Sequence, residues 1–409
     1  MAAGALAAMG VRATPLTTLT VAAFSLVDQI VKDALPAWKA LYPNVNIQIQ
    51  SRQYADHHTA MTTALSTSVL LPDVMVLESS FVGRFAQGAG LDDLTRAPYD
   101  IGRLRNQMVP FAYDQAISKT GAVVAMPTDI GPGTLLYRKD ILERAGVSES
   151  DLTHSWESYL EAGLKIKAKT GAHLVSHVQS IKDILIRSGI RPGEGLYFDK
   201  DSNVLVTSPR FVRAFELAKQ ARRQKLDARV SSWSNEWAEG LKRGTLATEL
   251  SGAWMVGQLG NWVAPATSGL WRAAQLPQGA AVAYGGAFYA IPRKSNPLGK
   301  ALAWQFIQMM TLDRGRQLQA FKAQDAFPAL LSAHDDPFFD APVGFLGGQA
   351  ARRLWREAAQ RITAVALHKQ SSFADEVIGT ELDKVLNHDK DIPLALADAQ
   401  RLLQQRAHR

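Results

Sequence analysis

TTLTVAAFSLVDQIVKDALPAWKALYPNVNIQIQ, residues 17–50, is the stretch that decides the fold. Its two ends, Thr17–Phe24 and Val45–Gln50, are rich in β-branched residues or alternate apolar with polar residues, and this pattern predicts strands. Between them, Ser25–Leu41 carries apolar residues at helical spacing, and Tyr42–Pro43 ends that helix because proline cannot continue it. The stretch therefore predicts a strand–helix–strand unit.

The same alternation continues along the chain. A helix at 57–68 and a strand at Asp73–Leu77 (DVMVL) follow the first unit, and a further strand is expected at Ala122–Met126, ended by the following proline. A long helix is expected at Trp156–Lys169, with Ser155 as its N-cap. Strands that alternate with helices predict βαβ units and a mostly parallel sheet, so the expected fold class is α/β.

The composition excludes several classes of protein. Of the 409 residues, 47% are hydrophobic and 20% are charged, which suits two or three folded domains and rules out a disordered or collagen-like chain. Lys and Arg (45) exceed Asp and Glu (38) by 7, a modest charge that gives no dedicated phosphate-binding face. The chain has no cysteine, so disulfides, thiolate nucleophiles, iron–sulfur clusters and cysteine-ligated zinc are excluded.

The first residues resemble the end of a secretory signal. Met1–Val11 (MAAGALAAMGV) is small and apolar, although no basic residue precedes it. No later stretch reaches the roughly 18–20 uninterrupted apolar residues of a membrane span. We expect a native leader, an added tail, or a secretory signal peptide that is removed or truncated in this chain.

Polar and aromatic residues follow the predicted strands. Ser25 follows the first strand, Gln53–Tyr54 the second, Glu78–Ser80 the third and Thr128–Asp129 a later one. Open α/β sheets bind their ligands at the carboxyl ends of the strands. Aromatic rings stack on the C–H faces of sugars and side-chain oxygens bond to hydroxyls, so these residues predict a site for a neutral polyol.

Six segments, taken in order, resemble one protein family. They are Leu71–Val76 (LPDVMV) followed by Phe85–Leu94 (FAQGAGLDDL), Val124–Asp129 (VAMPTD) with Leu136–Ile141 (LYRKDI), Ser155–Glu157 (SWE), Leu241–Ala247 (LKRGTLA) with Ser251–Trp254 (SGAW), Gly285–Ser295 (GGAFYAIPRKS), and Ala303–Ile307 (AWQFI). This order resembles extracellular solute-binding protein family 1, the periplasmic proteins of ABC importers, in the sugar-binding group that includes maltodextrin-binding protein. The resemblance runs from about Leu19 to the C-terminus. Arg138 departs from the pattern, since asparagine is usual there.

The resemblance implies a periplasmic-binding-protein-like fold of type II, with two α/β lobes and a ligand cleft between them. Lobe one is expected at 14–125 plus 286–328, and lobe two at 127–283 plus 329–409. The implied hinges lie near 126–127, 283–286 and 327–328. Closure of such lobes needs only a few backbone torsions, and Gly285–Gly286 can supply them.

The function that this resemblance implies is binding without chemistry. The protein is expected to bind a sugar, either a mono- or an oligosaccharide, and to deliver it to the transmembrane permease subunits of an ABC transporter. It is expected to be a monomer that uses no cofactor and no metal and binds no nucleic acid.

Ligand-binding residues are carried over from the family one position at a time. The implied set is Glu78, Ser79, Ser80, Asp129, His177, Gln179, Trp254, Gly285, Gly286 and Phe373, with Trp233 and Trp271 as looser candidates. Trp254 matches the family's stacking tryptophan, and Asp129 is expected to accept hydrogen bonds from ligand hydroxyls. Three other tryptophans have helical spacing and apolar neighbours, which places them in the core: Trp237, Trp304 and Trp355.

Enzymatic alternatives find little support in the residues. His173 and His177 have the spacing of a zinc-binding pair, but Leu174 stands where HExxH requires glutamate. Asp199–Asn203 lacks the glycine and glutamate of a calcium loop and is expected to form a turn. Glu78 and Asp129 could form the carboxylate pair of a glycoside hydrolase, but sequence does not give their separation.

A charged ligand is the alternative within the same family. A glycerol phosphodiester would require arginines or a helix N-terminus in the cleft. The unusual Arg138 is the residue that keeps this alternative open.

Overall fold

A computed structural model describes residues 17–86, 90–366 and 368–408. The signal-like segment Met1–Val11 lies outside these ranges. Among the helices in these ranges, none combines the length and apolar character that a bilayer crossing requires.

The predicted strand–helix–strand units form the N-terminal half of the sheet. β1 (Thr17–Phe24) pairs in parallel with β2 (Val45–Arg52) and with β3 (Val74–Glu78). The crossovers are α1 (Val27–Leu41) and α2 (Tyr54–Thr67), so these predicted elements are confirmed to within a few residues. The carboxyl ends of β1, β2 and β3 lie at one edge of the sheet, as expected for parallel strands.

β4 (Met126–Arg138) is the longest strand and joins the two halves of the sheet. Its first part pairs with β7 (Ala283–Ala290) and β8 (Phe327–Pro328), and its second part with β5 (Thr248–Gly252) and β6 (Trp271–Ala274), all antiparallel. The strand order is β2-β1-β3-β7-β4-β5, with β6 and β8 also on β4. The expectation of a mostly parallel sheet is therefore wrong: among the described strands β1 pairs in parallel with β2 and β3, while the pairings of β7 with β3 and of β4 with its neighbours are antiparallel.

The strand expected at 122–126 is wrong in its bounds, because β4 begins at Met126 and continues through Pro127. The pairing of β4 with β7 shifts register between Pro127 and Asp129. Such an irregularity tolerates a residue without a backbone N–H, which is why proline does not end the strand here.

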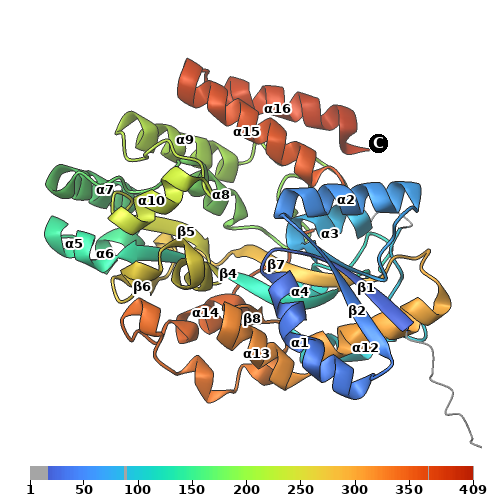
Figure 1. The fold of residues 1–409 in the computed structure, drawn as a ribbon. Helices are drawn as coiled ribbons and strands as arrows, with labels where there is room; N and C mark the ends of the chain where they lie inside the picture. The colour runs from blue at the N-terminus through green and yellow to red at the C-terminus, as the bar shows by residue number, and fades with distance from the viewer. Residues whose placement is uncertain (1–16, 87–89, 367, 409) are drawn as a thin grey trace, which may run out of the picture.

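Helices pack around both parts of the sheet (Figure 1). Their bounds are α3 (Ser79–Ala86), α4 (Pro110–Asp114), α5 (Lys139–Ala145), α6 (Glu149–Thr153), α7 (Trp156–Thr170), α8 (Gln179–Arg187), α9 (Pro209–Arg223), α10 (Asn235–Arg243), α11 (Met255–Gln258), α12 (Pro297–Leu312), α13 (Arg314–Gln324), α14 (Ala351–Gln360), α15 (Ser371–His388) and α16 (Ile392–Ala407). Ser155 caps α7 as predicted, since its hydroxyl accepts from the Ser158 N–H.

The hydrophobic core divides into two clusters that meet at β4. The first includes β1, β3, β7, α1 and α12, and the second includes α7, α9, α15 and α16. Figure 1 shows α1, α2 and α12 on one side of β4 and α5–α10 on the other. Trp237, Trp304 and Trp355 are buried in the first cluster, so their predicted core positions are confirmed. Parts of 237–273 and of 329–362 also pack into the first cluster.

Candidate functional site

Glu78 lies where β3 ends and α3 begins, with the two serines that follow it. Its carboxylate accepts hydrogen bonds from the Ser79 hydroxyl at 2.6 Å and from the Ser80 backbone N–H at 2.9 Å. The Ser80 hydroxyl also donates to it. The Tyr54 hydroxyl, from the start of α2, donates to Glu78 Oε2 at 3.0 Å. A carboxylate is stabilised at a helix start, so the local sequence Glu-Ser-Ser holds this charge at the sheet edge.

Asp129 brings a second carboxylate beside Glu78. Both residues pair with Ala287, one from β3 and the other from β4, so they flank the same position of β7. Burial raises the pKa of Asp129 to about 7; the negative charge of Glu78 adds to this shift, and the Ala287 N–H opposes it. Asp129 Oδ1 is excluded from solvent and has no hydrogen-bond partner among the described residues. A buried oxygen in this state is an acceptor that a ligand hydroxyl can satisfy.

Gly285 and Gly286 of β7 lie close to both Asp129 and Trp254. Their φ angles of 92° and 113° lie in the region that favours glycine. A Cβ on Gly286 would lie 3.0 Å from the Asp129 carbonyl oxygen, and a Cβ on Gly285 would lie 2.8 Å from Trp254 Nε1. Both positions therefore require glycine for the close approach of these residues.

Three tryptophans form a continuous aromatic surface next to these glycines. The rings of Trp254 and Trp233 are nearly parallel (13°) with centroids 5.9 Å apart, and those of Trp233 and Trp262 lie at 23° and 6.1 Å. The exposed fractions of Trp233 and Trp262 are 52% and 57%. Trp233 also has a φ of 70°, which is rare for a bulky side chain. These three residues are called the tryptophan surface below.

Hydrogen bonds orient two of the three rings of the tryptophan surface, those of Trp254 and Trp262. Trp262 Nε1 donates to Gln258 Oε1 at 2.7 Å. Beneath Trp233 lies the buried Trp237, with ring centroids 5.1 Å apart, and Trp237 Nε1 donates to Glu249 at 3.2 Å. Burial raises the pKa of Glu249 to about 7. Indole N–H groups that are already bonded leave the ring faces as the available contact surface.

Arg187 of α8 packs on Tyr284, the residue before Gly285 in β7 and a neighbour of the second core cluster. The Arg187 guanidinium lies 5.1 Å from the centre of the Tyr284 ring. Burial raises the pKa of Tyr54 far above its usual value, Glu78 adds to this, and the charge of Arg187 acts against it. The charge of Arg187 on α8 thus acts on Tyr54 on α2.

The structure brings together most of the residues expected from the sequence. Glu78, Ser79, Ser80, Asp129, Gly285, Gly286, Trp254 and Trp233 are joined by the contacts above. Tyr54 was expected only from its position after the second strand, and three site residues were not expected: Arg187, Trp262 and Tyr284. Trp262 follows Trp254 by two helical turns, a spacing that puts both on one face and was available in the sequence. No local pattern marks Arg187 or Tyr284.

The other candidates have contacts elsewhere. His177 Nδ1 accepts from the Gln179 N–H at 3.2 Å, and His177 Nε2 lies 3.1 Å from Arg222. Burial, and then the charge of Arg222, lowers the pKa of His177. Trp271 has no exposed surface and offers no ring face to a ligand. Phe373 is covered by the Arg406 guanidinium, 4.1 Å from its ring centre.

The Arg138 side chain is buried and makes its hydrogen bonds within the fold. Its guanidinium forms two hydrogen bonds with the Asp140 carboxylate, at 2.8 and 2.9 Å, and a third with the Leu241 carbonyl oxygen at 3.0 Å. It also lies 5.8 Å from the centre of the Trp271 ring. These three bonds engage every nitrogen of the guanidinium within the fold, so this side chain is not held ready for an anionic ligand.

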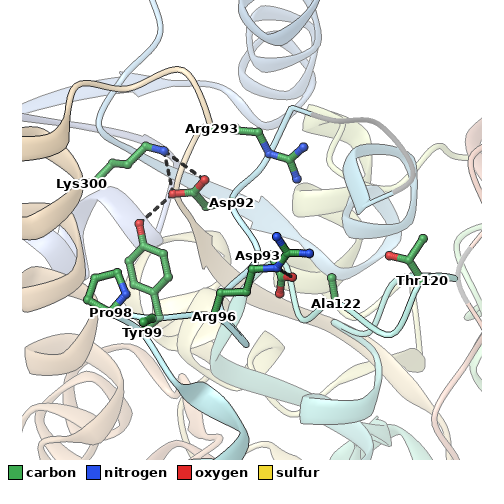
Figure 2. Close-up of a pocket in the computed structure, with 10 residues that line it drawn as sticks. Asp92, Asp93, Arg96, Pro98, Tyr99, Thr120, Ala122, Arg293 and Lys300 are labelled. Atoms are coloured by element: carbon green, nitrogen blue, oxygen red, sulfur yellow. Dashed lines mark hydrogen bonds and ion pairs between the residues drawn. The ribbon is translucent and has the colours of Figure 1, made fainter.

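A surface pocket of about 540 Å³ lies apart from these residues (Figure 2). It contains none of the expected site residues. Its acids are already paired: Asp92 accepts from Tyr99 at 2.7 Å and from Lys300 at 3.0 Å, and Asp93 pairs with Arg96 at 3.0 Å. A neutral ligand would have to compete with these pairs, so we place the candidate site at Glu78, Asp129 and the tryptophan surface.

The chain is similar to known solute-binding proteins. Residues 22–317 match the family model described as bacterial extracellular solute-binding protein. The lactose-binding protein of Rhizobium radiobacter is 26% identical over 88% of this chain and 88% of its own. An arabinooligosaccharide-binding protein of Bacillus subtilis is 24% identical over 50% of this chain and 47% of its own.

Solved structures share the fold over almost the whole chain. An extracellular solute-binding protein of family 1 has a TM-score of 0.80 at 21% identity, covering 96% of this chain and 100% of its own. The ABC-transporter-associated binding protein of B. animalis subsp. lactis, in complex with β-1,6-galactobiose, has a TM-score of 0.80 at 23% identity, covering 96% and 98%. These structures confirm the expected periplasmic-binding-protein-like fold of type II.

Proposed function

The chain belongs to the bacterial extracellular solute-binding protein family, and from this membership we propose that it binds a sugar and delivers it, chemically unchanged, to an ABC transporter. The sugar is a neutral mono- or oligosaccharide. The receiving partners are the transmembrane permease subunits, and the protein acts as a periplasmic monomer. The names of its relatives support this proposal, since they bind lactose, arabinooligosaccharides and galactobiose.

The observation that carries the proposal is the placement of an unpartnered acceptor beside open aromatic faces. Asp129 Oδ1 has no partner among the described residues, and through Gly286 and Gly285 it adjoins Trp254. A sugar presents C–H faces and hydroxyl edges at right angles, so one ring can stack on an indole while its hydroxyls donate to a carboxylate. This combination suits a neutral polyol better than a phosphate, which would require cations.

The two-lobed division remains part of the proposal. The proposed lobes are 14–125 plus 286–328 and 127–283 plus 329–409. In support, the three proposed hinges are neighbours: in β4, Asp129 pairs with Pro328 and Ala287, and Pro132 pairs with Ala283. Torsions at adjacent strand positions can rotate one lobe against the other as a unit. The ligand would bind between Tyr54, Glu78 and Asp129 on one side and Arg187 on the other.

Calorimetric titration of the protein against a panel of sugars tests this function. Galactobiose, lactose and arabinooligosaccharides are expected to release heat, whereas glycerol phosphate, the representative of a charged solute, is expected to release none. Heat from the phosphate alone would contradict the sugar proposal. Chromatography of the sugar after long incubation provides the second readout, since a cleaved product would identify an enzyme instead of a binding protein.

A further inference from the structure

His58 lies directly behind the Tyr54–Glu78 side of the ligand site. It follows Tyr54 by one turn of α2, and only 1% of its surface is exposed. His58 Nδ1 is 2.8 Å from the Tyr54 carbonyl oxygen, and the Glu78 backbone N–H donates to His58 Nε2 at 3.1 Å. The ring stacks on Phe81 of α3 with centroids 4.0 Å apart. One imidazole therefore connects the start of α2 with the end of β3.

These two hydrogen bonds determine the tautomer of His58. A carbonyl oxygen can only accept, so Nδ1 carries the hydrogen, and a backbone N–H can only donate, so Nε2 carries the lone pair. A proton added to Nε2 would remove the acceptor of the Glu78 N–H and bring two hydrogens together. The arrangement thus exists only with a neutral ring.

We propose that His58 is a positioning residue that holds Tyr54 and Glu78 in their ligand-binding arrangement while its ring is neutral, and that protonation of this ring weakens ligand binding. The proposal rests on the sugar-binding function proposed above. His58 does not touch the ligand; it acts through the backbone of the two residues whose side chains are joined by the 3.0 Å hydrogen bond.

The groups around His58 favour the neutral ring at neutral pH. Burial lowers the pKa of His58 below its usual value, while the hydrogen bond to Tyr54 and the charge of Glu78 act in the opposite direction. On its own helix His57 is the other titratable neighbour besides Tyr54, with ring centroids 5.0 Å apart. Arg52 of β2 acts on His57, and β1 and α3 contribute the uncharged rings of Phe24 and Phe81.

The expected consequence is a loss of affinity in acid. Because the ligand binds the form with neutral His58, the association constant should fall by about tenfold per pH unit once the pH is below the pKa of this ring. Asp129 also titrates, but its contribution is common to the variants compared below and cancels in their ratio.

Two substitutions separate the two hydrogen bonds of His58. In His58→Gln the amide oxygen can accept from the Glu78 N–H and does not titrate. In His58→Asn the shorter amide can donate to Tyr54 but leaves Glu78 without its acceptor. His57→Gln is the matched control, because His57 is equally buried on the same helix but bonds to the Val76 carbonyl oxygen at 2.7 Å.

The experiment is calorimetric titration of the four full-length proteins with the best sugar of the panel, from about pH 8 down to about pH 4, so that the range extends well below the usual histidine pKa. The wild type and His57→Gln are expected to lose affinity in acid, and His58→Gln to keep most of its affinity without this additional loss. His58→Asn should bind weakly throughout. A His58→Gln profile that parallels the wild type would overturn the proposal.

A ligand-independent measurement keeps the two proposals distinct. If the wild type binds no sugar at neutral pH, the proposed function fails, but nitrogen NMR of the imidazole still tests His58. If His58→Gln does not fold, the wild-type spectrum replaces the affinity comparison as the test of the His58 proposal. A neutral ring with its hydrogen on Nδ1 supports the positioning role, and a hydrogen on Nε2 contradicts it.

Discussion

The indole N–H of Trp254 donates a hydrogen bond to the carbonyl oxygen of Tyr284 at 2.8 Å. This bond directs the edge of the indole to the backbone immediately before Gly285, so the ring occupies the space that a Cβ at that glycine would need. The orientation of the principal stacking residue is thereby coupled to the strand, β7, that runs between the two parts of the sheet.

Gly285→Ala is expected to weaken both the fold and ligand binding. The substitution combines a positive φ with a Cβ 2.8 Å from Trp254 Nε1, so the unfolding free energy should drop by about 2 kcal/mol or more. Gly348→Ala is the matched control, because Gly348 has a φ of 87° but no atom within 4 Å of the added Cβ. Denaturant unfolding and sugar titration of both variants measure the difference; equal effects would show that the contact with Trp254 is unimportant.

Trp262→Ala is expected to affect long ligands selectively. Trp262 lies beyond Trp233 as seen from Trp254, so it can reach only the distal rings of an oligosaccharide. Affinity for a trisaccharide or longer sugar should fall by about 1–2 kcal/mol, and affinity for a disaccharide should hardly change. Leu70→Ala, at a side chain 86% exposed and remote in sequence, is the control for loss of surface apolar area. Equal losses for all chain lengths would contradict an extended binding surface.

Asp129→Asn is expected to stabilise the protein increasingly as the pH rises. The folded pKa of about 7 exceeds the unfolded value of about 3.9, so the wild type holds the extra proton when folded and loses stability as the pH rises through 7. Asparagine does not titrate. Its advantage in unfolding free energy should therefore grow by about 4 kcal/mol between about pH 4 and about pH 8. Urea unfolding at several pH values measures this, and a constant difference would refute the buried titration. Sugar affinity should fall, since the amide keeps one accepting oxygen but loses the charge and the second accepting oxygen of the carboxylate.

Arg138→Gln is expected to change stability and not binding. The substitution breaks the paired hydrogen bonds to Asp140 and leaves the Leu241 carbonyl without its donor, at a cost of about 2 kcal/mol in unfolding free energy. Sugar affinity should equal that of the wild type at a temperature where both are folded. A loss of sugar affinity without a loss of unfolding free energy would indicate that Arg138 contacts the ligand.

Ligand saturation is expected to make the molecule more compact. The ligand must bind the closed arrangement better than the open one if it is to shift the equilibrium between them. Small-angle scattering with and without the sugar should show a smaller radius of gyration on saturation. Gly285→Ala provides a comparison at the proposed hinge, and an unchanged wild-type profile would contradict closure.

Much of this organisation was predictable from local patterns. β1, α1, β2 and the N-cap Ser155 were expected almost at their observed bounds, because periodicity and capping depend on neighbouring residues only. The prediction that Pro127 ends a strand was wrong. Its place inside β4 depends on an irregular pairing with a strand about 160 residues later in the chain.

The candidate site was also only partly predictable from local patterns. Glu78, Asp129 and Trp254 could be expected from their positions after strands and from a family resemblance, but Tyr284 and Arg187 could not. Trp233 and Trp271 looked alike in sequence, yet one is half exposed and the other fully buried. Burial depends on which helices cover a residue, and that is a property of packing between distant segments.

Local order along the chain determined the α/β class, most helices and strands, and the polar residues at the strand ends, because each depends on interactions within a few residues. Tertiary structure alone decided that Glu78 and Asp129 flank one alanine, that three indoles share a surface, and that His58 joins two walls of the site. These relationships come from pairing and packing between segments far apart in sequence, where backbone hydrogen bonds and burial act across the whole sheet.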